Sequence, residues 1–373
     1  MHTKHSKLSK PSTGLYARNE FTILGTPCGV IEKLVQDLKA QMGNSLTIGY
    51  MDADHKAPEK EQMAALDTQY TDKIKFHAFT KVESPSSTHF RSFFHTTNLL
   101  FVNGNHFDGD QQLVVIDPAK YESLKKRKNR LTNVVGFLLK DVEKLPDFVY
   151  ELVKDAGKVP VLGIADLHGI ASLINKHIQT PKVKALILAG GKSVRMGKDK
   201  TQITYHDKPQ VQHLYELLER SGLDVYISHR QDQESPGGMR GLADTFLNLG
   251  PFGGILSALQ YDPDSAWLTV AIDMPFITQN SIDHILKNRD SNKLVTSYLN
   301  PENELPEPLF SIWEPQSYIH LLAMLSQGVT CPRKSIIKAE SKVLLHPEDL
   351  RVIKNINTPE DLEEARKLLE NQG

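Results

Sequence analysis

A glycine-rich segment crowded with basic residues stands in the middle of this chain, in the run LILAGGKSVRMGKDK at residues 186–200. A turn of this kind after an apolar strand lets backbone N–H groups approach a phosphate. The spacing differs from the phosphate loop G-x-x-x-x-G-K-[ST], because five residues separate Gly191 from Gly197 and Asp199 follows Lys198. It also differs from G-x-G-x-x-G, since its first two glycines are adjacent. The segment therefore predicts a phosphate-binding loop of a third kind.

Two further segments place suitable groups at the ends of predicted strands. In LGPFGGILSAL glycines precede an apolar helix, and in VAIDMPFI the acid Asp273 ends a strand. Ligands of open parallel sheets bind beyond the carboxyl ends of the strands, and Mg²⁺ prefers a carboxylate together with substrate phosphates. The turn at Gly190 and Gly191 can cradle a nucleotide, while Lys200 and Arg195 can neutralise its phosphate oxygens. These groups predict nucleotidyl transfer, in which a nucleophile attacks the α-phosphorus and pyrophosphate leaves.

The elements that must position these residues follow an alternation of short apolar runs and amphipathic stretches. This alternation predicts an α/β fold with mostly parallel sheets, and 373 residues exceed the roughly 250–300 that one core supports. We expect a disordered tail over 1–18, a first three-layer α/β domain over 19–178, a linker over 179–184 and a second such domain over 185–373. Expected strands cover 20–25, 45–52, 98–104, 111–117, 131–139, 159–164, 184–190, 224–229 and 265–273, with a later strand pair in KLVTSYL and EPLFSIW. Expected helices cover 30–42, 145–154, 168–177, 211–222 and 358–370, the last capped by Thr358 and Asp361.

The composition restricts the class of partner. A formal net charge of −1 and a pI near 7.0 predict neither a nucleic acid nor a membrane surface as partner. Two cysteines indicate a reducing compartment, and no apolar run approaches the ~20 residues of a membrane span. We therefore expect a cytoplasmic protein. The basic run KKRKNR at 125–130 is interpreted as a solvated loop or helix end.

A family resemblance extends this interpretation. The run L-A-G-G-x-S-x-R-M-G-x-D-K resembles the signature of the molybdenum cofactor guanylyltransferases, the MobA-like branch of the nucleotidyltransferases. The resemblance continues in the family's order over about 184–370, through HDKPQVQH, GPFGGILSAL, VAIDMPFI, PEPLFSIW and NINTPEDL. It implies a Rossmann-like nucleotidyltransferase fold that transfers GMP from GTP to molybdopterin with Mg²⁺ as cofactor. It also implies a molybdoenzyme or its chaperone as a partner.

The resemblance implies roles for individual residues. It implies a nucleotide site formed by Leu188, Ala189, Gly190, Gly191, Lys200, Asp244 and Asp273. Lys200 would contact the phosphates with Arg195 beside it, and Asp273 would bind the metal. Asn355 and Asn357 match an asparagine pair placed near the pterin substrate. The alternative is that their side chains close the turn before the last helix.

One departure from the family pattern leaves the nucleobase open. Ile227, Ser228 and His229 stand where the family often has an asparagine that touches the base. A cytidylyltransferase or a sugar-phosphate nucleotidyltransferase on the same fold is therefore an alternative. A non-catalytic nucleotide-binding adaptor is a third reading, which a Lys200→Ala variant would test by its transfer activity.

The chemistry implied by the resemblance needs no catalytic base, because the terminal phosphate of molybdopterin is already ionised. We therefore assign none. His206, His213 and His229 lack metal-ligand spacing and are interpreted as surface or packing residues.

The first half has the strand–turn–helix layout of a phosphate loop in ILGTPCGVIEKLVQDLKAQ, beginning at Gly25. Residues 30–32 read Val-Ile-Glu, so the Gly-Lys-Ser/Thr ending is missing. YMDADHK and LLFVNGNHFDG resemble segments of the MobB-like adaptor GTPases, which typically carry an acid where Asn103 stands. We predict a degenerate NTPase-like domain that no longer hydrolyses nucleotide and that docks to a partner or to another copy of the chain. Cys28 is interpreted as a packed thiol.

Overall fold

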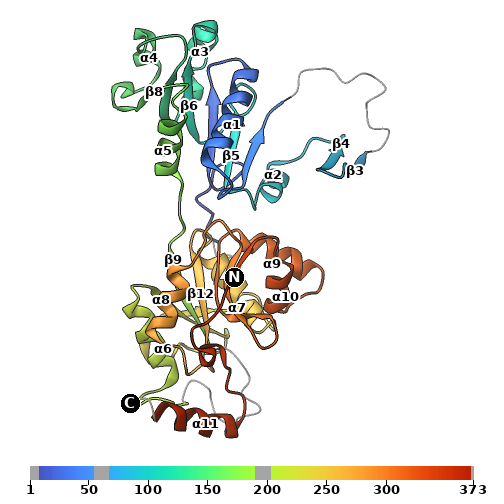
Figure 1. The fold of residues 1–373 in the computed structure, drawn as a ribbon, viewed down its shortest axis with the longest axis vertical. Coiled ribbons are helices and arrows are strands. Elements are labelled where there is room, and N and C mark those ends of the chain that lie inside the picture. Colours follow the sequence, from blue (N-terminus) through green and yellow to red (C-terminus); the bar gives the residue numbers. More distant parts are fainter. Residues whose placement is uncertain (1–7, 54–66, 190–202, 371–373) are drawn as a thin grey trace, which may run out of the picture. The chain divides into compact units, whose positions relative to one another are not determined.

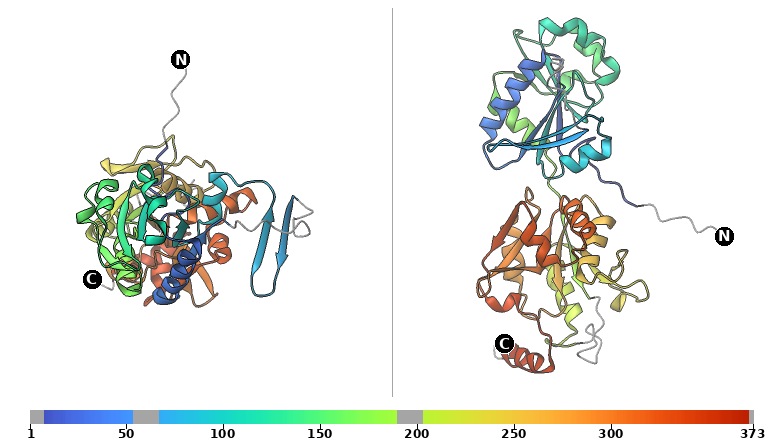
Figure 2. Two further views of the ribbon diagram at one scale, coloured as in Figure 1. Left: turned by 90° about the horizontal axis from the view of Figure 1, so that it is seen from above. Right: turned by 90° about the vertical axis from the view of Figure 1, so that its right-hand side faces the viewer.

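The chain forms two compact units, each with its own sheet. The computed structural model describes residues 8–53, 67–189 and 203–370 (Figure 1). One unit spans Thr13–Gln179, and the other comprises Thr180–Gly373 with the segment Met1–Ser12. Helices cover both faces of each main sheet, and most neighbouring strands are parallel (Figures 1 and 2). The α/β class with mostly parallel sheets is thus confirmed.

The N-terminal unit is built on a six-stranded sheet in which every pair of neighbours is parallel. The spatial order is β2-β5-β1-β6-β7-β8. The strands are β1 (Glu20–Leu24), β2 (Ile48–Met51), β5 (Leu99–Asn103), β6 (Gln111–Ile116), β7 (Val134–Leu139) and β8 (Val161–Gly163). β1, β5 and β6 are buried along their whole length, which agrees with their continuous apolar sequences.

Helices bury apolar stripes on both faces of this sheet. One face is covered by α1 (Cys28–Met42) and α5 (Leu167–His177), which pack against Phe21, Ile23 and Phe101. α3 (Tyr121–Lys125) and α4 (Asp147–Leu152) pack against residues of β6 and β7 in a second core cluster. The apolar alternation does not predict α2 (Ser87–Phe93) or the separate hairpin of β3 (Thr68–Asp72) and β4 (His77–Lys81).

The start of the N-terminal unit differs from the expected disordered tail. The backbone N–H groups of Leu15 and Tyr16 donate hydrogen bonds to the Glu20 carboxylate at 2.9 and 2.8 Å. Ala17 is 6% exposed and packs in a small core cluster. The Glu20 side chain therefore orders the segment that precedes it. The polar composition of the segment does not indicate this contact. The expected linker at 179–184 also overlaps β9, which begins at Val183.

The C-terminal unit has a seven-stranded sheet in the order β11-β10-β9-β12-β14-β13-β15. Its strands are β9 (Val183–Leu188), β10 (Asp224–His229), β11 (Gly241–Ala243), β12 (Ala266–Ala271), β13 (Val295–Asn300), β14 (Leu305–Trp313) and β15 (Lys342–Leu345). β9 to β12 are parallel, whereas β14 runs antiparallel to both of its neighbours. The expected late strand pair is thus confirmed as β13 and β14.

The helices of this unit also divide between the two faces of the sheet. α6 (Gln210–Arg220) and α8 (Gln279–Lys287) pack on one side, and α7 (Pro251–Tyr261), α9 (Ser317–Ser326) and α10 (Pro332–Lys338) on the other. α11 (Pro359–Glu370) begins with the expected reciprocal cap. Asp361 N–H donates to Thr358 Oγ1 at 3.1 Å, and Thr358 N–H donates to Asp361 Oδ2 at 3.1 Å.

Candidate active site

The strand order of the C-terminal unit creates a topological switch beside β9. From β9 the chain runs outward through β10 and β11 on one side and then returns to β12 on the other side. Leu188, the last residue of β9, is in register with Ser228 of β10 and Ala271 of β12. Ligands of open α/β sheets bind at such a switch, beyond the carboxyl ends of the strands. In the sequence, the glycine-rich segment follows Leu188 directly.

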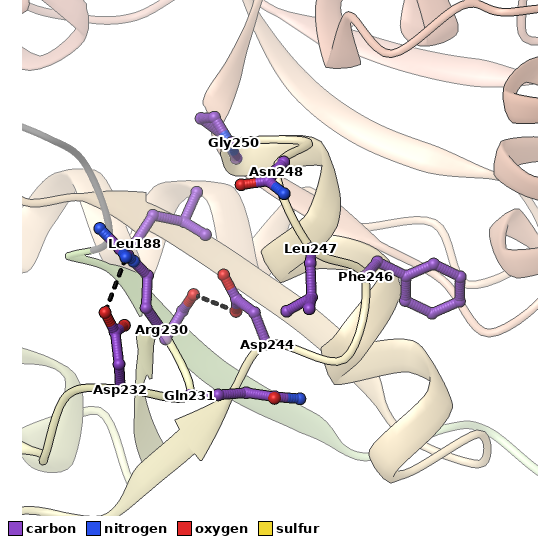
Figure 3. A pocket seen from close by; sticks show the side chains of 11 residues that line it. Leu188, Arg230, Gln231, Asp232, Asp244, Phe246, Leu247, Asn248 and Gly250 are labelled. Carbon is purple, nitrogen blue, oxygen red and sulfur yellow. Dashed lines mark hydrogen bonds and ion pairs between the residues drawn. The ribbon is translucent and has the colours of Figure 1, made fainter.

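A cavity of about 560 Å³ opens at this edge of the sheet (Figure 3). Its lining combines charged side chains, apolar side chains and the start of α7. The lining residues are Leu188, Ser228, Arg230, Gln231, Asp232, Asp244, Phe246, Leu247, Asn248, Gly250 and Pro251. A cavity of this size suits a small molecule with both apolar and polar groups. Of the predicted site residues, Leu188 and Asp244 line it.

Asp244 is held in the cavity wall by the end of the neighbouring strand. Ser228 Oγ donates a hydrogen bond to Asp244 Oδ1 at 2.7 Å, and Asp244 N–H donates to His229 O at 2.9 Å. Burial raises the pKa of the Asp244 carboxyl above its usual value, although the Ser228 hydroxyl opposes this shift. Ser228 belongs to the segment in which the sequence departs from the family pattern. The residue at this position therefore holds the Asp244 carboxylate in place through a hydrogen bond.

The glycines of GPFGG let α7 approach this wall closely. Gly250 adopts φ 57° and Pro251 follows as the first helical residue, so the helix N-terminus lines the cavity. A Cβ at Gly253 would lie 2.3 Å from the carbonyl oxygen of Phe246, and one at Gly254 would lie 2.8 Å from Ser228 Oγ. Helix N-termini favour anions. The segment therefore brings a positive helix end to the cavity, as its position after a strand suggests.

Asp273 follows β12, where the sequence predicts it, and the chain's C-terminal region packs against it. Ile356 N–H donates a hydrogen bond to Asp273 O at 2.8 Å, which brings the segment of Asn355 and Asn357 to this acid. Asn355 Oδ1 is buried and accepts no hydrogen bond from the described residues. The Asp361 carboxylate accepts hydrogen bonds from the N–H groups of Asn357 and Thr358 at the start of the last helix. Among the described residues, this carboxylate closes the turn, and no side-chain hydrogen bond of Asn355 or Asn357 does so.

Sequence reasoning missed a second buried acid near Asp273. Glu307 of β14 is 5% exposed, and Arg333 lies 3.3 Å from its Oε2 atom. Burial raises the pKa of Glu307, the negative charge of Asp273 adds to this, and the Leu309 N–H group and Arg333 oppose it. The signal was the acid inside the apolar strand EPLFSIW, because a charge in such a strand is costly unless it is paired.

Several predicted residues lie outside the described part of the chain. These are Gly190, Gly191, Arg195 and Lys200. Ala189, which directly precedes Gly190, follows the last residue of β9. Their predicted contacts with nucleotide phosphates stay predictions.

His206, His213 and His229 do not form one cluster. His206 and His213 stack with ring centroids 3.6 Å apart, whereas His229 Nδ1 lies 2.9 Å from Arg230 O. Burial, with repulsion from His206, lowers the pKa of His213 to about 4. Within the described residues, potential metal ligands cluster at Cys28, Asp52 and His106 of the N-terminal unit and not at these histidines.

The degenerate phosphate loop of the N-terminal unit has the expected turn after β1. Gly25 adopts φ 93°, and a Cβ there would lie 2.3 Å from Val115 O, so the turn requires glycine. α1 begins at Cys28, and the side chain of Cys28 is partly exposed with its Sγ atom 3.2 Å from His106 Nε2. The thiol is thus half-buried against His106, a residue of the loop that follows β5. Two arginines of the basic run bind backbone of the same unit, Arg127 at Gly104 O and Arg130 at Phe107 O.

A sheet with a switch at β9, a cavity at that edge and acids on the strand ends define a nucleotidyltransferase-like site. Comparisons with known proteins agree. The family described as MobA-like NTP transferase domain matches residues 185–343. A "Probable molybdenum cofactor guanylyltransferase" of Pyrococcus horikoshii is 31% identical over 137 residues, covering 35% of this chain and 69% of the relative. The chain therefore belongs to the MobA-like nucleotidyltransferase family, and its C-terminal unit makes it a transferase enzyme.

Two other relatives match over a longer stretch. A "Molybdenum cofactor biosynthesis bifunctional protein" of Synechocystis sp. is 34% identical over 186 residues, which is 49% of this chain and 53% of the relative. The chain thus matches about half the length of this relative. A "Probable molybdenum cofactor guanylyltransferase" of Natronomonas pharaonis is 28% identical, covering 49% of this chain and 96% of the relative. An additional N-terminal unit is consistent with the bifunctional relative.

None of the helices within the described residues combines the length and the apolar character that a membrane crossing would require.

Proposed function

We propose that the C-terminal unit transfers GMP from GTP to the terminal phosphate of molybdopterin and releases pyrophosphate. The observation that carries this proposal is the meeting of four chain segments at one sheet edge. Leu188 and Asp244 line the cavity, and Asp273 lies at the next strand end with Asn355 packed beside it. The names of the relatives give a guanylyl group as the group transferred and refer to the molybdenum cofactor, and GTP and molybdopterin are the donor and acceptor that we propose for this chain.

The roles of the chain's own groups follow from their chemistry. Leu188 and Ala189 lie at the strand end beside which the nucleotide binds, and the backbone at Gly190 and Gly191 approaches its phosphates. Lys200 and Arg195 neutralise the phosphate oxygens and favour attack at the α-phosphorus. Since the attacking phosphate of molybdopterin is already ionised, no side chain needs to act as general base.

Asp273 is the residue that would hold a divalent cation. A single carboxylate on a strand end offers hard oxygen donors and leaves most coordination positions to phosphate and water, which is the pattern that Mg²⁺ prefers. Bound Mg²⁺ would neutralise charge that develops on the phosphates. Asn355, whose buried Oδ1 atom has no hydrogen-bond donor among the described residues, lies beside this acid and is proposed to contact the acceptor substrate.

Asp244 is the group that we assign to the nucleobase. An ionised carboxylate only accepts hydrogen bonds, and guanine offers two adjacent donors, N1–H and the 2-amino group. Cytosine and adenine each place an acceptor beside their amino group, so the same carboxylate would be repelled. Because burial raises the pKa of Asp244, GTP binding should weaken as the pH falls through that pKa. Guanine is thus favoured over the alternative of a cytidylyltransferase.

The experiment is calorimetric titration of the whole chain with GTP, CTP and ATP in the presence of Mg²⁺. We expect a preference for GTP that Asp244→Asn reduces by about tenfold or more, since a bidentate contact to a base contributes roughly 1–3 kcal/mol. Asp273→Asn should remove the dependence of GTP binding on Mg²⁺. Asp224→Asn is the matched control, because Asp224 starts β10 at the opposite end of the strand and pairs with Arg240 in solvent.

The outcomes distinguish a guanylyltransferase from a cytidylyltransferase and from a non-catalytic adaptor. A preference for CTP in the wild type would move the assignment to a cytidylyltransferase. GTP binding that ignores Asp273 would refute the metal site. If GTP binds as expected but Lys200→Ala leaves GMP transfer to molybdopterin unchanged, the catalytic role of Lys200 is wrong. Binding without any transfer by the wild type would favour the adaptor reading.

We infer a separate role for the N-terminal unit. Residues 30–32 lack the lysine and hydroxyl of a working phosphate loop, and buried Asn103 replaces the acid expected in a MobB-like GTPase. These residues support a degenerate NTPase-like domain that does not hydrolyse nucleotide. Its proposed work is docking, either to a molybdoenzyme or its chaperone, or to another copy of the chain.

A further inference from the structure

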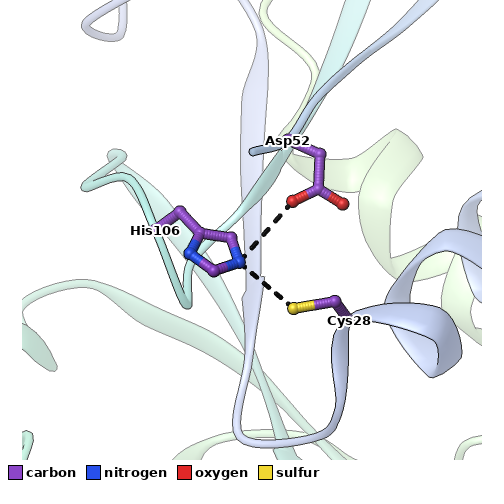
Figure 4. Close-up of side chains that lie close together, drawn as sticks. All are labelled: Cys28, Asp52 and His106. Carbon is purple, nitrogen blue, oxygen red and sulfur yellow. Dashed lines mark hydrogen bonds and ion pairs between the residues drawn. The ribbon is translucent and has the colours of Figure 1, made fainter. Parts of the chain in front are cut away.

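Three potential metal ligands converge at the carboxyl edge of the N-terminal sheet (Figure 4). Cys28 is the first residue of α1 after β1, Asp52 directly follows β2, and His106 lies in the loop after β5. His106 Nε2 is 3.2 Å from Cys28 Sγ and 3.8 Å from Asp52 Oδ1. The three ligand atoms all lie within 4.8 Å of one another. Three segments far apart in the sequence thus bring one sulfur, one nitrogen and one oxygen together.

The geometry does not fit a nucleophile activated by a histidine. In such a relay the imidazole stands between its partners, with the thiol on one ring nitrogen and the carboxylate on the other. Here the thiol and the carboxylate both face the same nitrogen, Nε2 (Figure 4). One atom cannot hydrogen-bond to both in a relay, whereas a cation among the three would contact each of them.

The separations suit a small tetrahedral cation. Bonds of about 2.3 Å to sulfur and about 2.0–2.2 Å to nitrogen and oxygen, at tetrahedral angles, place neighbouring ligand atoms about 3.4–3.6 Å apart. The observed distances of 3.2 and 3.8 Å bracket this value. The third separation, between Cys28 Sγ and the Asp52 carboxylate, is at most 4.8 Å, so a bound cation would draw these two side chains closer together.

The surrounding residues orient the three ligands. Tyr50 Oη donates to Asp52 Oδ2 at 2.7 Å, and the buried Asn103 donates through Nδ2 to Asp52 Oδ1 at 2.8 Å. Asn105 Nδ2 lies 3.7 Å from Cys28 Sγ, and the Arg127 guanidinium donates to Asn105 Oδ1 at 3.0 Å. Outer partners of this kind hold metal ligands in position. Asn103, which replaces the acid of a GTPase, thus orients the Asp52 carboxylate through this hydrogen bond.

Cys28 is the first residue of the 15-residue helix α1, and its side chain lies beside the loop that carries His106. A thiolate, an imidazole and a carboxylate together select zinc-like cations over Mg²⁺ and Ca²⁺, which prefer oxygen alone.

We propose that Cys28, Asp52 and His106 form a binding site for a divalent transition metal of the zinc class. Three protein ligands leave a fourth position for water or an exogenous ligand. The site lies at the sheet edge where the turn after Gly25 would hold phosphates in a working NTPase. In this degenerate unit, the same edge would therefore bind a metal ion in place of nucleotide phosphates. Binding releases the thiol proton to solvent.

The test uses the full chain stripped with a chelator and titrated with Co²⁺, which takes zinc sites and reports thiolate ligation by a sulfur-to-cobalt charge-transfer absorption. We expect this absorption to saturate at one equivalent per chain and to disappear when Zn²⁺ is added. Cys28→Ser should abolish it. His106→Gln and Asp52→Asn should each weaken Co²⁺ binding at least tenfold, with unchanged far-ultraviolet circular dichroism.

Cys331→Ser is the matched control, because Cys331 is the second of the chain's two cysteines, is exposed and lies in the C-terminal unit. It should bind Co²⁺ like the wild type. The proposal is overturned if the wild type shows no charge-transfer absorption, or if Cys28→Ser retains it. It is also overturned if both His106→Gln and Asp52→Asn bind Co²⁺ as tightly as the wild type. None of these readouts depends on GMP transfer, so the proposed transferase function can fail or hold independently.

Discussion

Replacing Arg289 with alanine should strongly destabilise the C-terminal unit. Arg289 Nε and Nη2 donate to the two oxygens of Glu314 at 2.6 and 2.7 Å, and Nη2 also donates to Pro181 O at 2.9 Å. The Glu314 side chain is fully buried and that of Arg289 is 12% exposed. Removing the cation from a buried carboxylate costs about 3–5 kcal/mol of unfolding free energy.

Urea denaturation followed by tryptophan fluorescence measures this loss in the relevant unit. The chain has two tryptophans, Trp267 and Trp313, and both are buried in the C-terminal unit. Trp313 directly precedes Glu314, so its emission reports on the surroundings of the ion pair. The N-terminal unit has no tryptophan and does not contribute to this signal.

Arg351→Ala is the matched control. Arg351 Nη2 lies 2.7 Å from Asp349 Oδ2, the same distance as in the buried pair, but the two side chains are 41% and 42% exposed. An exposed pair of this kind contributes about 0–1 kcal/mol. Equal destabilisation by Arg289→Ala and Arg351→Ala would refute the reasoning, because burial would then not decide the strength of these pairs.

Two further predictions concern a half-buried histidine and a tightly packed glycine of the C-terminal unit. Burial lowers the pKa of His213 to about 4, below the ordinary value of 6.5, so protonation favours the unfolded chain and stability is lost as the pH falls from 6.5 towards 4. His213→Gln should spare about 1–2 kcal/mol of that loss in the same urea assay, since solvent around the half-buried ring roughly halves the ~3.4 kcal/mol of the full shift. Gly253→Ala, whose Cβ would lie 2.3 Å from Phe246 O, should displace the cavity loop and weaken GTP binding in calorimetry at least tenfold. Gly29→Ala, with nothing within 4 Å, should bind GTP normally; equal binding by both variants would contradict the packing argument.

The chain's periodicity determines its elements and the end of the sheet that carries chemistry. A continuous apolar run predicts the strand at 184–190, because a strand covered on both faces has no polar side. Thr358 and Asp361 predict the start of the last helix through a cap that spans three residues. Asp273 could be placed at a ligand-binding edge because parallel strands end together. All these inferences rest on groups that are close in sequence.

The tertiary structure decided which distant groups meet. Ser228 supports Asp244 only because β10 and β11 are neighbours. The segment of Asn355 reaches Asp273 because the N–H group of Ile356 donates a hydrogen bond to Asp273 O, 83 residues earlier in the chain. Cys28 was predicted to be a packed thiol, and only the fold places it against His106, from a loop more than seventy residues later. Local hydrophobic patterning specifies which side of an element is buried, but it carries no information on strand order. The order of the strands determines which loops share an edge, and therefore which side chains form a site.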